Sequence, residues 1–448
     1  MANPLASHPH EMFSQGIKFG DYRVRVFAVT WLAYAGFYFC RKNFSIAMPL
    51  LEKELQFTVD DFKWIIFAYS LTYMLGQFIC GVLSDRHGPR LIVSIGMVVA
   101  VIANLCMGIS ATPFAFLLLG ALNGSSQSTG WSGTLKNMAP WYAQRERGVV
   151  MAWWATCYVL GAFLATQFAA WCISSNAPFA DWGWKRAFWL PALVLTGIAI
   201  LFGFFTRNRP TDVGLPELED IDPEEAEAIA LATEDGEEPE DNSDEQAGLA
   251  NILEVLSHSA VWITGAMYFF LKLTRYAIIY WTPLYLVKHL GMDDVAAGRT
   301  SSWYEGIGFF GAIFAGYVSD RLFSARRFPV GSLMLLGLAG VCYLEPTLVK
   351  WGSYGPALAM ALLGFMTYGP DTLMTGAGAM DIGTPRRAAT AAGVINGMGS
   401  CGQLISPFVV AYMTKAYGWD SLFYLFVGCA LIGALLLATK WNYGVHDK

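Results

Sequence analysis

Twelve long apolar stretches divide this chain, and they constrain its fold more than any other feature. Each can cross the hydrocarbon core of a bilayer, which takes about 20 apolar residues in a helix. Of the 448 residues 55% are hydrophobic and only 14% charged, against about 25% charged in soluble domains. The sequence therefore predicts an all-α membrane protein with twelve transmembrane helices, at residues 24–50, 61–83, 91–110, 113–138, 147–172, 186–206, 259–288, 300–318, 329–345, 353–380, 388–413 and 419–440.

The connections between these stretches alternate in charge. Cations gather in every second connection, at Arg23, Arg25, Arg86, Arg90, Arg145, Arg147, Arg321, Arg326, Arg327, Arg386 and Arg387. The opposite connections hold Asp60, Asp61, Asp181, Asp293 and Asp294 with fewer cations. The positive-inside rule then predicts that both termini are cytoplasmic in a multi-pass protein of the cell (inner) membrane. The first residues lack the features of a cleaved signal peptide, so the first spanning helix is expected to direct insertion.

One connection differs from the others in length and charge. Between residues 217 and 245 it contains fifteen Asp or Glu and no Lys or Arg, which also explains the net charge of −6. Low apolar content with high charge is typical of disorder. We therefore predict three parts: an N-terminal bundle at 1–206, an acidic cytoplasmic linker at 207–258 and a C-terminal bundle at 259–448. Residues 223–232 in the linker are compatible with a short amphipathic helix.

An internal repeat relates the two halves. GVLSDR at 81–86 recurs as GYVSDR at 316–321, and GWKRAFWL at 183–190 is matched by GWDSLFYL at 418–425, both at an offset of 235. Arg41 and Arg275 are 234 residues apart. The chain is thus predicted to be two duplicated six-helix bundles, a layout in which the solute binds at mid-membrane between the halves.

The first spanning stretch carries cations where membrane helices rarely have any. Fifteen residues without a charged side chain, 26–40, run into Arg41 and Lys42, and an apolar run then resumes. Fifteen residues cross only about two-thirds of a bilayer core, so both cations must lie inside it. Such charges are costly and mark sites. Because guanidinium is a rigid fork of donors, we predict that Arg41 and Arg275 together bind an anionic solute.

Several motifs carry a family resemblance. They are GVLSDRHGPR at 81–90, YAGFYFCRKNF at 34–44, RYAIIYWTPLYL at 275–286, YGP at 368–370, RERG at 145–148 and WYEGIGFFGAIFAGYVSDR at 303–321. They resemble the major facilitator superfamily and, within it, the organophosphate:inorganic phosphate antiporter family, over nearly the whole chain except the acidic linker. The resemblance implies the major facilitator fold, phosphate binding by Arg41 and Arg275, and site positions for Tyr34, Tyr38 and Lys42.

The chain departs from family members at several site positions. Cys157 stands where the glycerol-3-phosphate antiporter has a histidine, and Gln77 where it has a lysine. Trp131 begins a WSGT sequence that replaces a family motif on the fourth helix, and the acid–lysine pair of the hexose-phosphate transporter is missing from 405–409. Lys272 is an added cation where a tyrosine is expected. These departures bear on which substrate is bound.

Other polar residues in the spanning stretches have more than one interpretation. Lys272 is either a contact for a second anionic group or the partner of a buried acid, and Asp371 is expected to balance it or to carry a proton. Lys42 and Glu305 are predicted to form a buried ion pair that gates the site. Lys136 is interpreted as snorkelling to the interface, lining an entry funnel or binding the ligand. Further candidate cavity liners are Trp131, Gln127, Trp154, Tyr158, Asn396 and Gln403.

These expectations support three hypotheses about the function of the protein. The first is a secondary transporter that exchanges glycerol-3-phosphate, a hexose phosphate or a phosphoglycerate for inorganic phosphate by alternating access. The second is a membrane sensor of sugar phosphate that signals to a partner, and the third is a proton-coupled symporter of organic anions. No nucleophile–base arrangement, phosphate loop or metal-type cluster suggests an enzyme, a cofactor or a metal. The expected partners are the phosphorylated metabolite, phosphate and the bilayer, with no nucleic acid, and the protein is expected to be a monomer.

Overall fold

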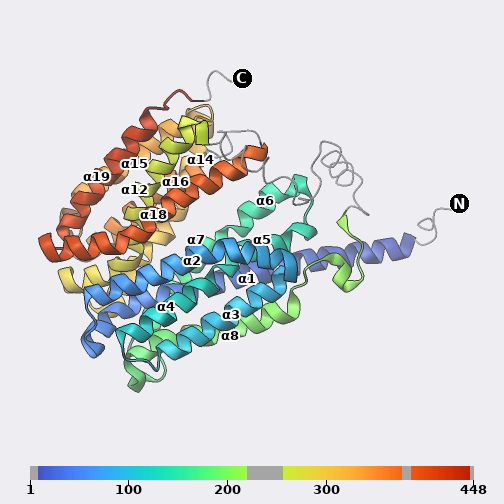
Figure 1. Ribbon diagram of the computed structural model, residues 1–448, viewed down its shortest axis with the longest axis horizontal. Helices are drawn as coiled ribbons and strands as arrows, with labels where there is room; N and C mark the ends of the chain where they lie inside the picture. The colour runs from blue at the N-terminus through green and yellow to red at the C-terminus, as the bar shows by residue number, and fades with distance from the viewer. Residues whose placement is uncertain (1–8, 219–255, 376–384, 444–448) are drawn as a thin grey trace.

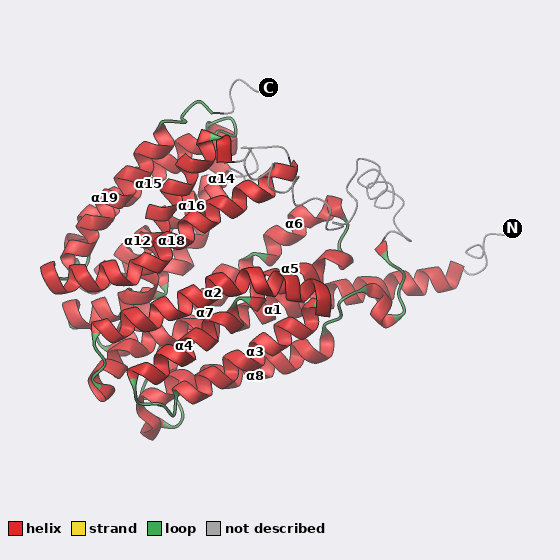
Figure 2. Cartoon of the chain, viewed as in Figure 1, coloured by secondary structure: helices red, strands yellow, loops and turns green. Residues whose placement is uncertain are grey.

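The computed structural model describes residues 9–218, 256–375 and 385–443, and this part of the chain is built from helices without strands (Figures 1 and 2). The predicted fold class is confirmed, since twelve helical spans can be traced through it. Seven helical stretches are long and apolar enough on their own to cross a membrane. The remaining spans carry buried charges or consist of two helices in series. Most of the acidic linker and the residues around Asp381, which the sequence suggested as a loop, lie outside the described residues.

The N-terminal half contains eight α-helices that form six spans. Their bounds are α1 Pro9–Leu55, α2 Val59–His87, α3 Pro89–Met107, α4 Pro113–Gln127, α5 Thr129–Met138, α6 Gln144–Trp154, α7 Thr156–Cys172 and α8 Arg186–Phe205. Helices α4 and α5 meet at Ser128 and together form the fourth span, while α6 and α7 meet at Ala155 and form the fifth. A capping box at Thr58 and Asp61 begins α2 after a tight turn.

The C-terminal half repeats this arrangement. Its helices are α12 Ser259–Leu290, α13 Asp294–Ser301, α14 Trp303–Leu322, α15 Arg327–Leu348, α16 Gly355–Thr375, α18 Pro385–Tyr417 and α19 Asp420–Ala438. The neighbours agree between halves: α2 packs on α4 as α14 packs on α16, and α3 packs on α8 as α15 packs on α19. Helix α1 packs on α7 as α12 packs on α18. These equivalent pairings are what a duplicated bundle requires.

The halves meet along one part of their length. Helix α1 contacts α12, α2 contacts α18, and α7 contacts α13 and α14. The side-chain contacts lie towards the C-terminal ends of α1 and α12, where Lys53 Nζ is 2.9 Å from Asp294 Oδ1 and Lys288 pairs with Glu52. Lys415 at the end of α18 pairs with Asp60 at the start of α2. The opposite end carries the N-terminal part of α1 and the end of α19 (Figure 1).

Candidate anion-binding site

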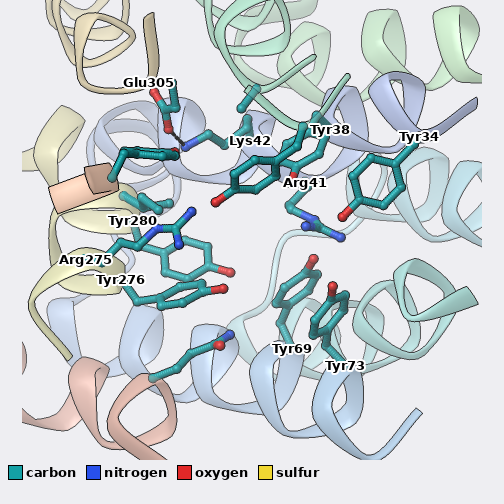
Figure 3. A pocket seen from close by; sticks show the side chains of 15 residues that line it. Tyr34, Tyr38, Arg41, Lys42, Tyr69, Tyr73, Arg275, Tyr276, Tyr280 and Glu305 are labelled. Atoms are coloured by element: carbon teal, nitrogen blue, oxygen red, sulfur yellow. Dashed lines mark hydrogen bonds and ion pairs between the residues drawn. The ribbon is translucent and has the colours of Figure 1, made fainter. Parts of the chain in front are cut away.

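A cavity of about 90 Å³ lies between the two halves. Helices from both halves line it, with α1, α2 and α7 on one side and α12, α14, α16 and α18 on the other (Figure 3). Its principal lining residues are Tyr34, Tyr38, Arg41, Lys42, Tyr69, Tyr73, Tyr158, Arg275, Tyr276, Tyr280, Glu305, Tyr368 and Gln403. Tyrosine hydroxyls from both halves and the two predicted arginines thus surround one space.

Arg41 enters this cavity from α1, and part of its guanidinium group has no hydrogen-bond partner. Its Nε donates to Gln127 Oε1 at 3.2 Å, and its guanidinium carbon lies 4.7 Å from the ring centre of Tyr38 and 4.9 Å from that of Tyr73. Its Nη2 is buried without a hydrogen-bond partner. Among the residues that the structure describes, no carboxylate lies within ion-pair distance of this guanidinium. A half-buried guanidinium without a carboxylate partner is suited to an anion from solution.

Arg275 enters from α12 and differs from Arg41 in having a resident anion. Its Nη1 donates to Asp371 Oδ2 of α16, and both side chains are buried. Its guanidinium carbon lies 4.6 Å from the ring centre of Tyr368 and 5.4 Å from that of Tyr158. Arg275 Nε and Asp371 Oδ1 have no partner. The ion pair therefore uses one donor and one acceptor and leaves other donors of the guanidinium fork for a ligand.

Lys42 and Glu305 form an ion pair across the two halves. Both are buried, with exposed fractions of 5% and 2%, and both line the cavity. The pair joins α1 of the N-terminal half to α14 of the C-terminal half. Nearby, Gln167 Nε2 donates to Ser302 Oγ at 2.8 Å between α7 and the start of α14. The pair proposed from the sequence is thus present in the geometry.

Lys272 lies one helical turn before Arg275 on α12 and outside the cavity lining. Its Nζ donates to Asn396 Oδ1 at 2.6 Å, lies 3.4 Å from Ser400 Oγ, and sits 4.8 Å from the ring centre of Tyr268. It is buried, and no described carboxylate lies within ion-pair distance of it. The expectation that Asp371 balances Lys272 is wrong for this conformation. The carboxylate pairs with Arg275 instead, because α16 places it beside that guanidinium.

The remaining predicted site residues divide between the cavity and its surroundings. Tyr34 and Tyr38 line the cavity, whereas Trp131 and Cys157 lie outside its lining. The exposed Trp131 ring is 5.2 Å from that of Tyr34, and Cys157 belongs to the same buried cluster as Tyr34. Gln77 lies one turn beyond Tyr73 on α2 and does not line the cavity. Lys136 donates to Gly81 O at 2.9 Å and pairs with Asp85 at the end of α2, away from the cavity.

The sequence interpretation missed five tyrosines that line the cavity. They are Tyr69, Tyr73, Tyr276, Tyr280 and Tyr368. The first four form two pairs, and the members of each pair are four residues apart on one helix face, as Tyr34 and Tyr38 are. A search for this spacing beside the intramembrane arginines would have found Tyr276 and Tyr280, which follow Arg275, but not Tyr69 and Tyr73 on α2. The rings of Tyr69 and Tyr73 point their hydroxyls towards Arg41 in Figure 3.

Comparison with known proteins identifies the family. Residues 30–396 match the family model described as Major Facilitator Superfamily. The chain therefore belongs to the major facilitator superfamily, and it is a multi-pass membrane transporter rather than an enzyme. Within that superfamily its relatives confirm the resemblance to the organophosphate:inorganic phosphate antiporter family.

Relatives of similar length align with nearly the whole chain. A probable hexose phosphate transport protein of Chlamydia trachomatis is 29% identical, over 94% of this chain and 91% of its own. The glycerol-3-phosphate transporter of Bacillus subtilis is 27% identical, over 94% and 93%. The membrane sensor protein UhpC of Salmonella typhimurium is 29% identical, over 98% and 95%.

Solved structures share the fold. A bacterial homologue of the human lysosomal transporter Spinster, in an inward-facing and occupied conformation, aligns with a TM-score of 0.73 at 14% identity. That alignment covers 95% of this chain and 98% of the other. The nucleoside transporter NupG aligns with a TM-score of 0.67 at 10% identity, over 94% of this chain and 99% of its own. At these identities the likeness concerns the fold alone.

Proposed function

We propose that this protein is a secondary transporter that exchanges a phosphorylated organic metabolite for inorganic phosphate by alternating access. The observation that carries the proposal is the pair Arg41 and Arg275, which enter one cavity from opposite halves. A ligand held by both guanidinium groups bridges the halves and favours their closing around it. The tyrosine hydroxyls that surround the arginines provide further donors for phosphoryl and sugar oxygens.

The charges around the cavity support a phosphorylated ligand. Four cations lie in or beside it, namely Arg41, Lys42, Lys272 and Arg275, against the two carboxylates of Glu305 and Asp371. The excess of two positive charges matches a phosphate monoester, which carries about −1.5 to −2 at neutral pH. A neutral sugar would leave this excess uncompensated in the membrane, which is costly.

The relatives point to the organic part of the substrate. Transport proteins for hexose phosphate and for glycerol-3-phosphate align end to end with this chain. Glycerol-3-phosphate, a hexose phosphate and a phosphoglycerate are accordingly the substrates that we propose. Tyr34 and Tyr38 are proposed to contact them, with Lys272 beside the site, and Trp131, Cys157 and Gln77 to shape its surroundings. Lys136, which pairs with Asp85 at the end of α2, is proposed to line the entry to the cavity.

Alternating access is proposed to open the two ends of the cavity in turn. The ion pair of Lys42 with Glu305 and the contacts of α1 with α12 support closure at the end where these helices finish. We infer that this end faces away from the cytoplasm, with the termini cytoplasmic in the inner membrane. The acidic stretch at 207–258 is proposed to link two bundles, at 1–206 and 259–448, in a monomeric protein.

Counterflow in proteoliposomes tests the exchange. Vesicles that contain the purified protein and are loaded with phosphate are expected to take up labelled phosphate rapidly, and unloaded vesicles slowly. Adding unlabelled glycerol-3-phosphate, glucose-6-phosphate or 3-phosphoglycerate outside should compete in proportion to affinity. Uptake that is indifferent to internal phosphate would contradict exchange. Protein-free vesicles serve as the control.

A second candidate function is a membrane sensor of sugar phosphate, favoured by the alignment with the membrane sensor protein UhpC. The cavity would then bind the ligand without carrying it across. The counterflow experiment separates the two functions, because a sensor stabilised by the phosphorylated ligand would show no exchange. Thermal stabilisation by ligand without counterflow would favour the sensor.

A further inference from the structure

We propose that Asp371 is an internal counter-ion that holds Arg275 in the empty transporter, and that it passes to Lys272 when the phosphoryl group of the substrate binds Arg275. This inference rests on the proposed function, since it describes how that substrate gains access to one of the two arginines. Asp371 and Lys272 would act together as positioning residues. Three features of the structure lead to it.

The first feature is the difference between the two halves. The internal repeat sets Arg275 against Arg41 at an offset of 234, and the same offset sets Lys272 against Tyr38. Between α4/α5 and α16 the offset is 240, since Gly124 faces the backbone oxygen of Tyr69 as Gly364 faces that of Tyr304, and Asp371 therefore corresponds to Trp131. The C-terminal half therefore has an acid and a base that the N-terminal half lacks at the equivalent positions. The added charges are opposite, and they flank the one arginine that is neutralised.

The second feature is that Asp371 makes a single hydrogen bond to Arg275 rather than a bidentate pair. A carboxylate can accept two parallel hydrogen bonds from a guanidinium group, which is the strongest geometry for this pair. Here only Nη1 of Arg275 meets Oδ2, while Arg275 Nε and Asp371 Oδ1 are buried and unpartnered. A phosphoryl dianion offers more charge and more acceptors than this carboxylate. It can therefore displace Asp371 from Arg275.

The third feature is a second cation that can receive the displaced carboxylate. A carboxylate with an exposed fraction of 5% cannot remain charged without a partner. Lys272 lies three residues before Arg275, on the same face of α12, and α12 packs against α16. Its ammonium group bonds only neutral oxygens in the described structure, those of Asn396 and Ser400. Transfer of Asp371 to Lys272 keeps every charge paired and needs no proton.

The handover has a consequence for binding. In the empty transporter Asp371 competes with phosphate for Arg275, so it weakens phosphate binding and assists release. Removing the carboxylate should strengthen binding, whereas removing Lys272 alone should weaken it because the displaced carboxylate loses its acceptor. Removing both should abolish the effect of Lys272.

The experiment measures the dissociation constant of inorganic phosphate by calorimetry on the purified full chain. Asp371→Asn is expected to bind phosphate about tenfold more tightly and Lys272→Met about tenfold more weakly. The double variant should bind as tightly as Asp371→Asn. Asp181→Asn, at an exposed position in the 3-10 helix Ala180–Lys185, is the matched control and should equal the natural protein. Size-exclusion profiles and thermal unfolding establish that each variant is folded.

Three outcomes would overturn the handover. Asp371→Asn binding no more tightly than the natural protein would show that the carboxylate does not compete. A loss on Lys272→Met that persists in the double variant would show that Lys272 contacts phosphate directly. Protons moving with phosphate in the natural protein, but not in Asp371→Asn, would assign Asp371 to proton coupling. If the natural protein bound no phosphorylated ligand and Arg41→Gln changed nothing, the proposed function itself would fail.

Discussion

At the scale of single residues, the shape of the cation decides how well the cavity holds a phosphoryl group. Replacing Arg41 or Arg275 by Lys keeps the positive charge and removes the planar fork of donors. Each substitution is expected to lower phosphate counterflow at least about tenfold, since bidentate contacts are lost. The measurement is initial uptake into phosphate-loaded proteoliposomes. Lys185→Arg, at the end of the 3-10 helix that leads into α8, is the control for the exchange of one cation for another. Unchanged transport in Arg41→Lys would argue against bidentate binding.

The buried pair of Lys42 and Glu305 makes a second prediction at this scale. Glu305→Gln leaves the Lys42 ammonium group buried without a counter-ion, which typically costs about 3–5 kcal/mol. The closed arrangement of α1 against α14 should therefore be destabilised. The double variant Lys42→Met with Glu305→Gln removes the orphaned charge and should recover most of the stability.

Thermal unfolding in detergent compares the two variants of this pair. A lower midpoint for Glu305→Gln than for the double variant is the expected order. If both variants unfold at the same temperature as the natural protein, the pair does not stabilise this conformation. Phosphate counterflow of the same samples then tests whether the pair also gates transport.

At the scale of helices, close packing inside each half depends on glycine. A Cβ atom added at Gly311 of α14 would lie 2.1 Å from the backbone oxygen of Phe365 on α16. Backbone atoms cannot move aside as a flexible side chain can, so the two helices would have to separate. Gly311→Ala is expected to cost about 1–3 kcal/mol. Gly316→Ala on the same helix, where nothing lies within 4 Å, is the matched control.

Thermal unfolding of these two alanine variants provides the measurement. Gly311→Ala should unfold at a clearly lower temperature than Gly316→Ala. Equal midpoints would mean that α14 and α16 adjust to the added methyl group without loss of packing.

The ion pairs between the halves make a prediction about conformation. Lys288 pairs with Glu52 and Lys53 with Asp294 where α1 and α12 end. Exposed pairs contribute only about 0–1 kcal/mol each, yet a conformational equilibrium near balance responds to such energies. Glu52→Lys places two cations together and should favour opening at this end. Adding Lys288→Glu restores an attractive pair and should reverse the effect.

Spin labels at Gln56 and Met292, in a cysteine-free background, report the distance across this end of the molecule. The distance distribution should shift to longer values in Glu52→Lys and return in the charge-swapped double variant. If the distance distribution stays the same in both variants, these pairs do not hold the end closed.

The helices themselves could be predicted well from the sequence, while the cavity could be predicted only in part. The predicted span at 113–138 coincides with α4 and α5, and most others agree within a few residues. Membrane helices are predictable because bilayer thickness sets their length and apolarity. Arg41 and Arg275 were recognisable for the same reason, as charges in an apolar run. The tyrosines on α2 were not, because tyrosine also packs in ordinary cores.

At the scale of the whole molecule, the acidic stretch is expected to be separable from transport. Deleting residues 219–245 removes many like charges and leaves the described helices intact. Counterflow of phosphate should stay within about twofold of the natural protein, because a solvated tether contributes little to binding or closure. Loss of counterflow with normal expression and folding would instead assign the stretch a part in the transport cycle. A neutral linker of equal length is the control.

What the sequence determined by itself is the number of spans, the duplication and the family, because each follows from order along the chain. The length of each apolar stretch identifies a spanning helix, and the repeated motifs at an offset of 235 identify the two duplicated halves. Which charges pair was decided only by the tertiary structure. Asp371 has two cations, Lys272 and Arg275, within one turn of α12, and sequence spacing cannot choose between them. The packing of α16 against α14 and α12 brings its carboxylate to Arg275 and leaves Lys272 with neutral partners.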